Sequence, residues 1–236
     1  MGGIRRALPP STRTSASMRT DTPPAPVAGR GMLIAIAIVC CGIEGTLWLA
    51  DWGLFGPYRW RVMSLEYGAF WRGLLLNWKP NYPGQPQAMF VTYAFLHGGP
   101  LHLLGNMLVL AWIGPQLADR VGQARFGLVW LVSLLGGAVA FALLSASLSP
   151  MVGASGALFG VIGALVALRW RTDRDWRRVA WASGGLVLLN LVTLIAQGGI
   201  LAWETHLGGY LGGLLAGARL TYRQFDEDEW HSDFGR

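Results

Sequence analysis

Residues 145–160 read SASLSPMVGASGALFG, and this stretch interrupts a segment of unusual length. The segment 126–168 holds 43 positions without a charge, about twice the ~20 residues that one membrane-spanning helix needs. The Ser- and Pro-rich run that ends at Pro150, followed by Met-Val-Gly-Ala, favours a break over one continuous helix. The stretch therefore predicts two helices, the second beginning at Ser155.

The composition indicates a membrane protein. The chain is 53% hydrophobic and only 14% charged, whereas soluble domains carry roughly 25% charged residues. Its net charge of +6 does not indicate nucleic-acid binding, because the positive residues fall in short clusters between apolar runs, the pattern that sets membrane topology. The lipid bilayer is the expected environment. The two cysteines, Cys40 and Cys41, are adjacent and form no disulfide framework or metal-ligand spacing.

The apolar runs predict an all-α membrane protein with six transmembrane helices. The runs are 31–50, 101–118, the two halves of 126–168, 179–197 and 203–218. The Pro- and Ser-rich segment 1–30 is predicted to be a disordered tail, because it cannot bury a core. A second, acidic tail is predicted at 221–236, which leaves a domain over 31–220.

Counting positive residues by loop sets the orientation. With the N-terminus inside, the inner segments hold 15 of the 19 Lys and Arg residues, so both termini are expected in the cytoplasm. The other four lie in the long outer loop 51–95, which is rich in Trp, Gly and Pro. Because Trp and Tyr prefer the membrane interface, this loop is expected to be partly embedded there. A bacterial inner membrane is the expected location.

Four polar side chains on three different spans are predicted to share one depth. Counted from the charged residue at the inner end of each span, Ser155, Asn106 and His206 lie 13 or 14 residues deep, roughly 20 Å. His102 lies about one turn further out. Because the hydrocarbon core is ~30 Å thick, these groups should converge about 10 Å below the outer surface. A helix that begins there at Ser155 needs irregular backbone at depth, which favours a cavity open to the outside.

This arrangement suits a nucleophile. At a helix N-terminus, Ser155 would have unpaired backbone N–H groups beside it that can hold an oxyanion. Gly153 and Gly156 would let the chain and a substrate approach closely. His206 could take the hydroxyl proton as general base and return it to a leaving amine.

The histidines and the asparagine favour this chemistry over metal binding. His102 and Asn106 are i,i+4 on one helix face, where they could donate to an oxyanion. His97 and His102 are five apart and have no acidic residue with them in the span, so no metal site is predicted. No cofactor is needed for the reaction.

The same residues form three motifs in order along the chain. They are Gly153-Ala154-Ser155-Gly156, His97…His102…Asn106, and His206…Gly209…Gly213. With these motifs the chain resembles the rhomboid intramembrane serine proteases over roughly 32–220, and it is expected to share their six-helix bundle. The four-residue spacing of Gly209 and Gly213 by itself also predicts close helix packing, because small residues at this spacing let two helices touch.

The resemblance implies an endopeptidase that cleaves transmembrane segments of single- or multi-span membrane-protein substrates. Ser155 and His206 would form its catalytic dyad. His102, Asn106 and the Ser155 backbone N–H, with Gly153 beside them, would bind the oxyanion. The expected supporting residues are His97, Gly156, Phe159, Gly209 and Gly213.

Some features leave alternatives open. A catalytically silent rhomboid-like membrane adaptor, or a transporter, is the competing function. Many family members carry Trp-Arg shortly before the first motif histidine; here Trp71-Arg72 lies further upstream, so the anchoring of the outer loop is open. Glu204 is expected to be a solvated residue at the outer rim, and Glu44 in the first span has no assigned partner. The oligomeric state is likewise open.

Overall fold

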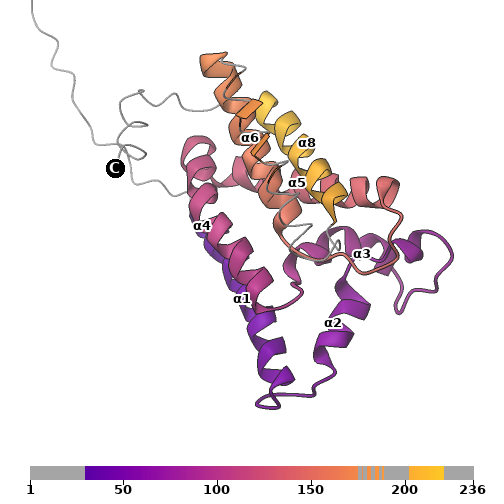
Figure 1. The fold of residues 1–236 in the computed structure, drawn as a ribbon. Coiled ribbons are helices and arrows are strands. Elements are labelled where there is room, and N and C mark those ends of the chain that lie inside the picture. The colour runs from indigo at the N-terminus through magenta and orange to yellow at the C-terminus, as the bar shows by residue number, and fades with distance from the viewer. Residues whose placement is uncertain are drawn as a thin grey trace, which may run out of the picture.

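The computed structural model describes residues 30–174, residues 177, 180, 181, 184, 185 and 188, and residues 202–220. Within this part the chain is all-helical, with one isolated backbone bridge (Figure 1). The elements are α1 (Gly31–Asp51), α2 (Trp60–Gly68), η1 (Arg72–Leu75), α3 (Gln85–Thr92), η2 (Tyr93–Phe95), α4 (Pro100–Val121), α5 (Gln123–Leu144), α6 (Ser155–Asp173) and α8 (Trp203–Arg219).

The helices confirm an all-α membrane protein. By length and composition, α1, α4 and α5 are long and apolar enough to cross a membrane. The helices α6 and α8 coincide with two further predicted spans and have 19 and 17 residues. The predicted span 179–197 falls mostly outside the described residues, as do both predicted tails, so the count of six spans stays a prediction.

The turn between α4 and α5 is tighter than the sequence suggested. Residues 119–125, which separate the predicted runs 101–118 and 126–168, are helical except at Gly122, since α4 continues to Val121 and α5 begins at Gln123. Gly122 has φ +81°, a left-handed conformation that glycine adopts without strain. Its N–H donates to the carbonyl of Ala118, and its own carbonyl accepts from Phe126. Charge counting misplaced the helix ends because charged residues near the membrane surface need not leave the helix.

The helices α6 and α8 lie side by side because glycines remove the side chains between them (Figure 1). A methyl group on Gly209 would overlap the carbonyl oxygen of Gly156, and one on Gly213 would overlap that of Gly160. Small residues at four-residue spacing thus allow backbone-to-backbone contact, as the sequence predicts. This contact sets how closely the residues at the start of α6 approach those on α8.

A buried carboxylate fixes the outer loop to α1. Glu44 is only 2% exposed, and both of its oxygens accept hydrogen bonds from the Arg61 guanidinium at 2.9 and 3.2 Å. The Arg61 Nε also donates to Asp51 at 2.6 Å. Burial disfavours the charge on Arg61, but the hydrogen bonds to Glu44 and Asp51 outweigh it and raise the pKa of Arg61. Arg61 is therefore the partner of Glu44, and this network fastens α2 against α1.

Two further contacts join the outer loop to the helix core. Phe70 and Met151 exchange both backbone hydrogen bonds at 3.0 Å, which ties the loop to the segment before α6. The Phe70 ring is fully buried. Arg72 donates through Nε to the carbonyl of Ala142 near the end of α5, at 3.2 Å. Arg72 therefore ties the outer loop to α5.

Candidate active site

The first two residues of the site are a serine and a histidine in hydrogen-bond contact. Ser155 opens α6, and His206 lies in the first turns of α8. The His206 Nε2 is 2.7 Å from the Ser155 Oγ. For Nε2 to accept the hydroxyl proton, the neutral imidazole must carry its own proton on Nδ1. Residues 51 positions apart in sequence are thus brought into the geometry that a nucleophile and its general base require.

An aromatic ring fixes the plane of the histidine. Phe159 lies one turn after Ser155 on α6, and its ring stacks on that of His206 with centroids 4.3 Å apart and planes 3° apart. Both side chains are buried. The stacked ring restricts rotation of the imidazole, so Nε2 stays directed at the serine.

His102 presents a proton toward Gly153. The backbone N–H of Gly98 donates to His102 Nδ1 at 3.3 Å, so in the neutral ring the proton lies on Nε2. A Cβ on Gly153 would lie 2.9 Å from that Nε2. Gly153 has φ +124°, a conformation that side-chain-bearing residues rarely adopt, so both the space and the backbone require glycine.

A second donor points to the same place. Asn106 is 6% exposed, and among the described residues its side-chain Nδ2 has no hydrogen-bond partner. This Nδ2 lies 3.6 Å from the position of a Cβ on Gly153. A buried amide donor without a partner costs about 1–3 kcal/mol unless a ligand satisfies it. At the N-terminus of α6, the Ser155 N–H is a further donor outside the helix ladder.

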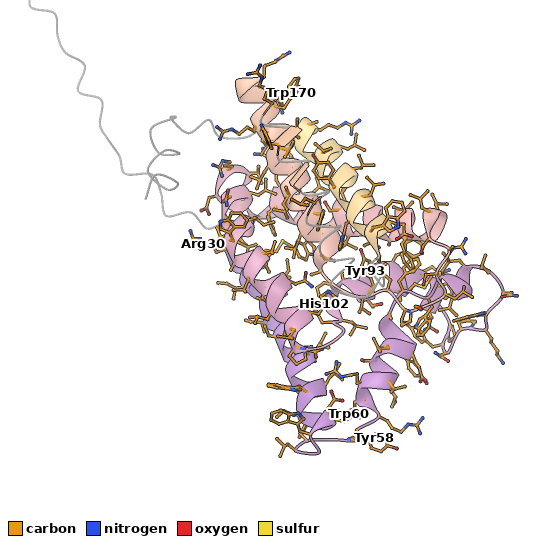
Figure 2. The ribbon with its side chains drawn as sticks, viewed as in Figure 1. Arg30, Tyr58, Trp60, Tyr93, His102 and Trp170 are labelled. Atoms are coloured by element: carbon orange, nitrogen blue, oxygen red, sulfur yellow. The ribbon has the colours of Figure 1, made fainter. Side chains whose placement is uncertain are left out.

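Tyr93 supports this segment and was missed by sequence reasoning. Its carbonyl accepts the Gly153 N–H at 2.9 Å, and its hydroxyl donates to the carbonyl of Leu134 on α5 at 2.7 Å. Figure 2 shows Tyr93 and His102 in the middle of the molecule, far from Trp60 at the start of α2. A buried tyrosine needs a partner for its hydroxyl, but the sequence does not say which one.

His97 lies behind the site rather than in it. Its side chain is 1% exposed, and its ring meets that of His102 edge to face with centroids 5.3 Å apart. Burial, and next the proximity of His102, lower the pKa of His97 to about 4, so the ring is neutral at pH 7. The structure thus places it as packing support for His102.

The structure corrects the expected exposure of Glu204. Glu204 was expected at a solvated rim, but it is 6% exposed. It lies in the first turn of α8, where the helix dipole favours a negative charge. Gly156 leaves room for the neighbour of His206, since a Cβ on it would lie 2.7 Å from Thr205 Cγ2.

Two cavities in the described part of the chain, of about 490 and 210 Å³, do not include Ser155 in their lining. Both of those lie in or beside the outer loop. Ser155 is itself half-buried and not fully enclosed by the described residues.

Comparison with known proteins finds relatives whose names describe them as rhomboid proteins. RHOMBOID-like protein 6, mitochondrial, from Arabidopsis thaliana is 35% identical over 149 residues, 60% of this chain and 46% of that protein. Rhomboid protease GlpG from Klebsiella pneumoniae is 28% identical over 177 residues, 67% of this chain and 61% of that protein. Rhomboid-like protease 5 from Toxoplasma gondii is 36% identical over 135 residues, 52% and 15% of the two chains.

The chain covers less than two thirds of each of these relatives. They come from a plant, a bacterium and a protozoan, so they do not support the expected bacterial inner membrane. A family model described as the rhomboid domain matches residues 85–223, more than half of the chain and all of the residues placed in the site. The chain belongs to the rhomboid family.

Proposed function

We propose that this chain is an intramembrane serine endopeptidase that uses a Ser155–His206 dyad. The observation that carries the proposal is the 2.7 Å contact between His206 Nε2 and Ser155 Oγ, made by residues of two different helices. Both ends of the chain are proposed to face the cytoplasm, which follows from the distribution of Lys and Arg.

The reaction begins with the serine. Ser155 Oγ attacks the carbonyl carbon of a substrate peptide bond while His206 Nε2 takes its proton. The resulting oxyanion is bound by His102 Nε2–H, Asn106 Nδ2–H and the Ser155 backbone N–H, groups that surround Gly153. The imidazolium then gives its proton to the leaving amine, and an acyl-serine ester remains.

Water completes the cycle. His206 takes a proton from a water molecule as the oxygen of that water attacks the ester carbonyl. The second tetrahedral intermediate uses the same donors, and its collapse returns the proton to Ser155 Oγ. The cycle uses no metal or cofactor, because the imidazole handles every proton and the fixed donors stabilise every oxyanion.

The proposed substrates are transmembrane segments of other membrane proteins. From Ser155 to Arg169, the first charged residue toward the inner end of α6, is 14 residues or roughly 21 Å, a depth that corresponds to the outer part of the bilayer. A stable substrate helix keeps its peptide groups in internal hydrogen bonds, so cleavage favours segments with small or helix-breaking residues near their outer end.

Cleavage in reconstituted vesicles tests the proposal. The purified chain is mixed with a panel of single-span reporter proteins, and Ser155→Ala and His206→Ala are each expected to abolish cleavage. Ser149→Ala is a matched control, because this serine is exposed in the loop before α6. Loss of cleavage in Ser149→Ala alone, or full activity in either dyad variant, would refute the dyad.

A fluorophosphonate probe separates the competing function. A protease is expected to be labelled at Ser155, and labelling should disappear in Ser155→Ala. A catalytically silent adaptor or a transporter would give neither cleavage nor labelling while remaining folded.

A further inference from the structure

A small cavity lined by both aromatic and polar residues, here called the loop cavity, lies in the outer loop away from the candidate active site. Its volume is about 210 Å³, and Glu66, Trp71, Leu74, Trp78, Lys79 and Asn81 line it. These residues come from the end of α2, from the region of η1 and from the segment that leads into α3. None of them takes part in the proposed proteolysis.

Hydrogen bonds hold the walls of the loop cavity in place. The carbonyl of Glu66 accepts from Asn81 Nδ2 at 3.0 Å and from Gln85 Nε2 at 2.7 Å. Gln85 is fully buried, and its Oε1 accepts the backbone N–H of Asn81 at 2.7 Å. Because one buried amide fastens both segments, the cavity is formed before any ligand arrives.

Two indole rings form one wall. The Trp71 and Trp78 centroids are 5.8 Å apart with planes at 45°. Trp71 is fixed by a 2.7 Å hydrogen bond from Nε1 to the carbonyl of Leu65. Trp78 lies on Gly73, where a Cβ would overlap its ring. Both residues line the cavity, and a tryptophan face attracts an alkylammonium ion that lies within about 6 Å of the ring centroid.

The charges that line the loop cavity have opposite signs. Glu66 and Lys79 are both exposed, and in the described part of the chain neither forms an ion pair. A carboxylate beside the tryptophans adds attraction for an ammonium group. An ammonium of Lys79 offers a contact for a phosphate. This pair of charges matches a ligand that carries one positive and one negative group.

The surroundings favour a lipid over a soluble molecule. Leu75 and Leu76 in the same turn are 40% and 61% exposed, which gives an apolar surface beside the cavity. Tryptophan-rich loops prefer the level of the lipid headgroups. A headgroup in the cavity would place its acyl chains on this apolar surface.

We propose that the loop cavity binds the headgroup of a zwitterionic phospholipid. The ammonium lies against Trp71 and Trp78 and faces Glu66, and the phosphate contacts Lys79. The site takes choline or ethanolamine headgroups and disfavours phosphatidylglycerol, which lacks the ammonium.

Native mass spectrometry of the full chain in a neutral maltoside detergent tests this site. Phosphatidylcholine, phosphatidylethanolamine and phosphatidylglycerol with identical acyl chains are titrated, and the fraction of protein that retains one lipid is measured. Glu66→Gln removes the carboxylate charge at an exposed position, so it leaves folding intact. Trp78→Leu removes one ring, and Trp52→Leu is the control, because Trp52 is 64% exposed at the end of α1, outside the cavity.

The wild type is expected to retain both zwitterionic lipids in preference to phosphatidylglycerol. Glu66→Gln and Trp78→Leu should each weaken that retention at least about threefold, while Trp52→Leu leaves it unchanged. Equal retention of phosphatidylglycerol, or unchanged retention in Glu66→Gln, would overturn the proposal. So would displacement of the lipid by a lysine-rich peptide, which would assign the cavity to a protein ligand, or by soluble phosphocholine at the affinity of the whole lipid.

Discussion

Replacing Gly209 by alanine tests how the contact between α6 and α8 controls the dyad. The added Cβ would lie 2.7 Å from the carbonyl carbon of Gly156, and it would overlap the oxygen of that carbonyl. Ordinary carbon contacts are about 3.5–4.0 Å, so the two backbones must separate by about 1 Å at this point. Gly156 adjoins Ser155, and Gly209 lies one turn from His206, so the dyad receives most of that displacement.

The expected loss follows from the length of the hydrogen bond. A separation of about 1 Å would take the 2.7 Å contact between Ser155 Oγ and His206 Nε2 beyond hydrogen-bond range. Misplacement of this size lowers the rate by about 10²-fold, and overpacking costs about 1–3 kcal/mol of stability. Gly42→Ala is the matched control, because nothing lies within 4 Å of its added Cβ on α1.

Cleavage of a reporter in vesicles and thermal unfolding in detergent are measured for both variants. Gly42→Ala is expected to keep full activity and stability. If Gly209→Ala cleaved at the wild-type rate, or lost no more stability than Gly42→Ala, the argument from close backbone contact would be wrong.

Two further predictions concern the oxyanion site and the outer loop. Asn106→Ala should lower kcat about 10²–10³-fold with little change in KM, because the Asn106 amide is an unsatisfied donor beside Gly153. Steady-state cleavage kinetics measure both constants. A change confined to KM, with kcat unaltered, would contradict this prediction. Arg61→Met should destabilise the fold by about 3–5 kcal/mol, because it leaves the carboxylate of Glu44 buried without a partner. Denaturant unfolding with the exposed Arg59→Met as control measures the difference, and equal stability of the two variants would rule out a structural role for the pair.

The sequence predicted the elements whose causes are local. The break before Ser155 follows from Ser, Pro and Gly in an uncharged segment, and α6 begins at that residue. Counting residues from the inner charges predicted one depth for Ser155, Asn106 and His206; in the structure His206 contacts Ser155, and Asn106 lies beside Gly153. Glycine spacing on α8 likewise indicated a close helix contact, because the absence of a side chain can be read directly.

Features that depend on distant partners could not be predicted. Nothing near Glu44 in the sequence indicates Arg61, and the hydroxyl of Tyr93 could have met any carbonyl of the core. Glu204 was placed in solvent because charge alone suggests exposure, whereas the packing of α8 buries it. The outer loop contains α2 and α3, which its Pro, Gly and Trp content concealed.

The paired backbones of Phe70 and Met151 have a mechanical consequence. Met151 is two residues before Gly153, so this pairing joins the outer loop to the segment that leads into α6. A displacement of the loop at Phe70 would therefore be passed directly to Met151 and the residues just before Ser155. Amide hydrogen exchange at these two positions should accordingly rise and fall in step whenever the bilayer composition is altered.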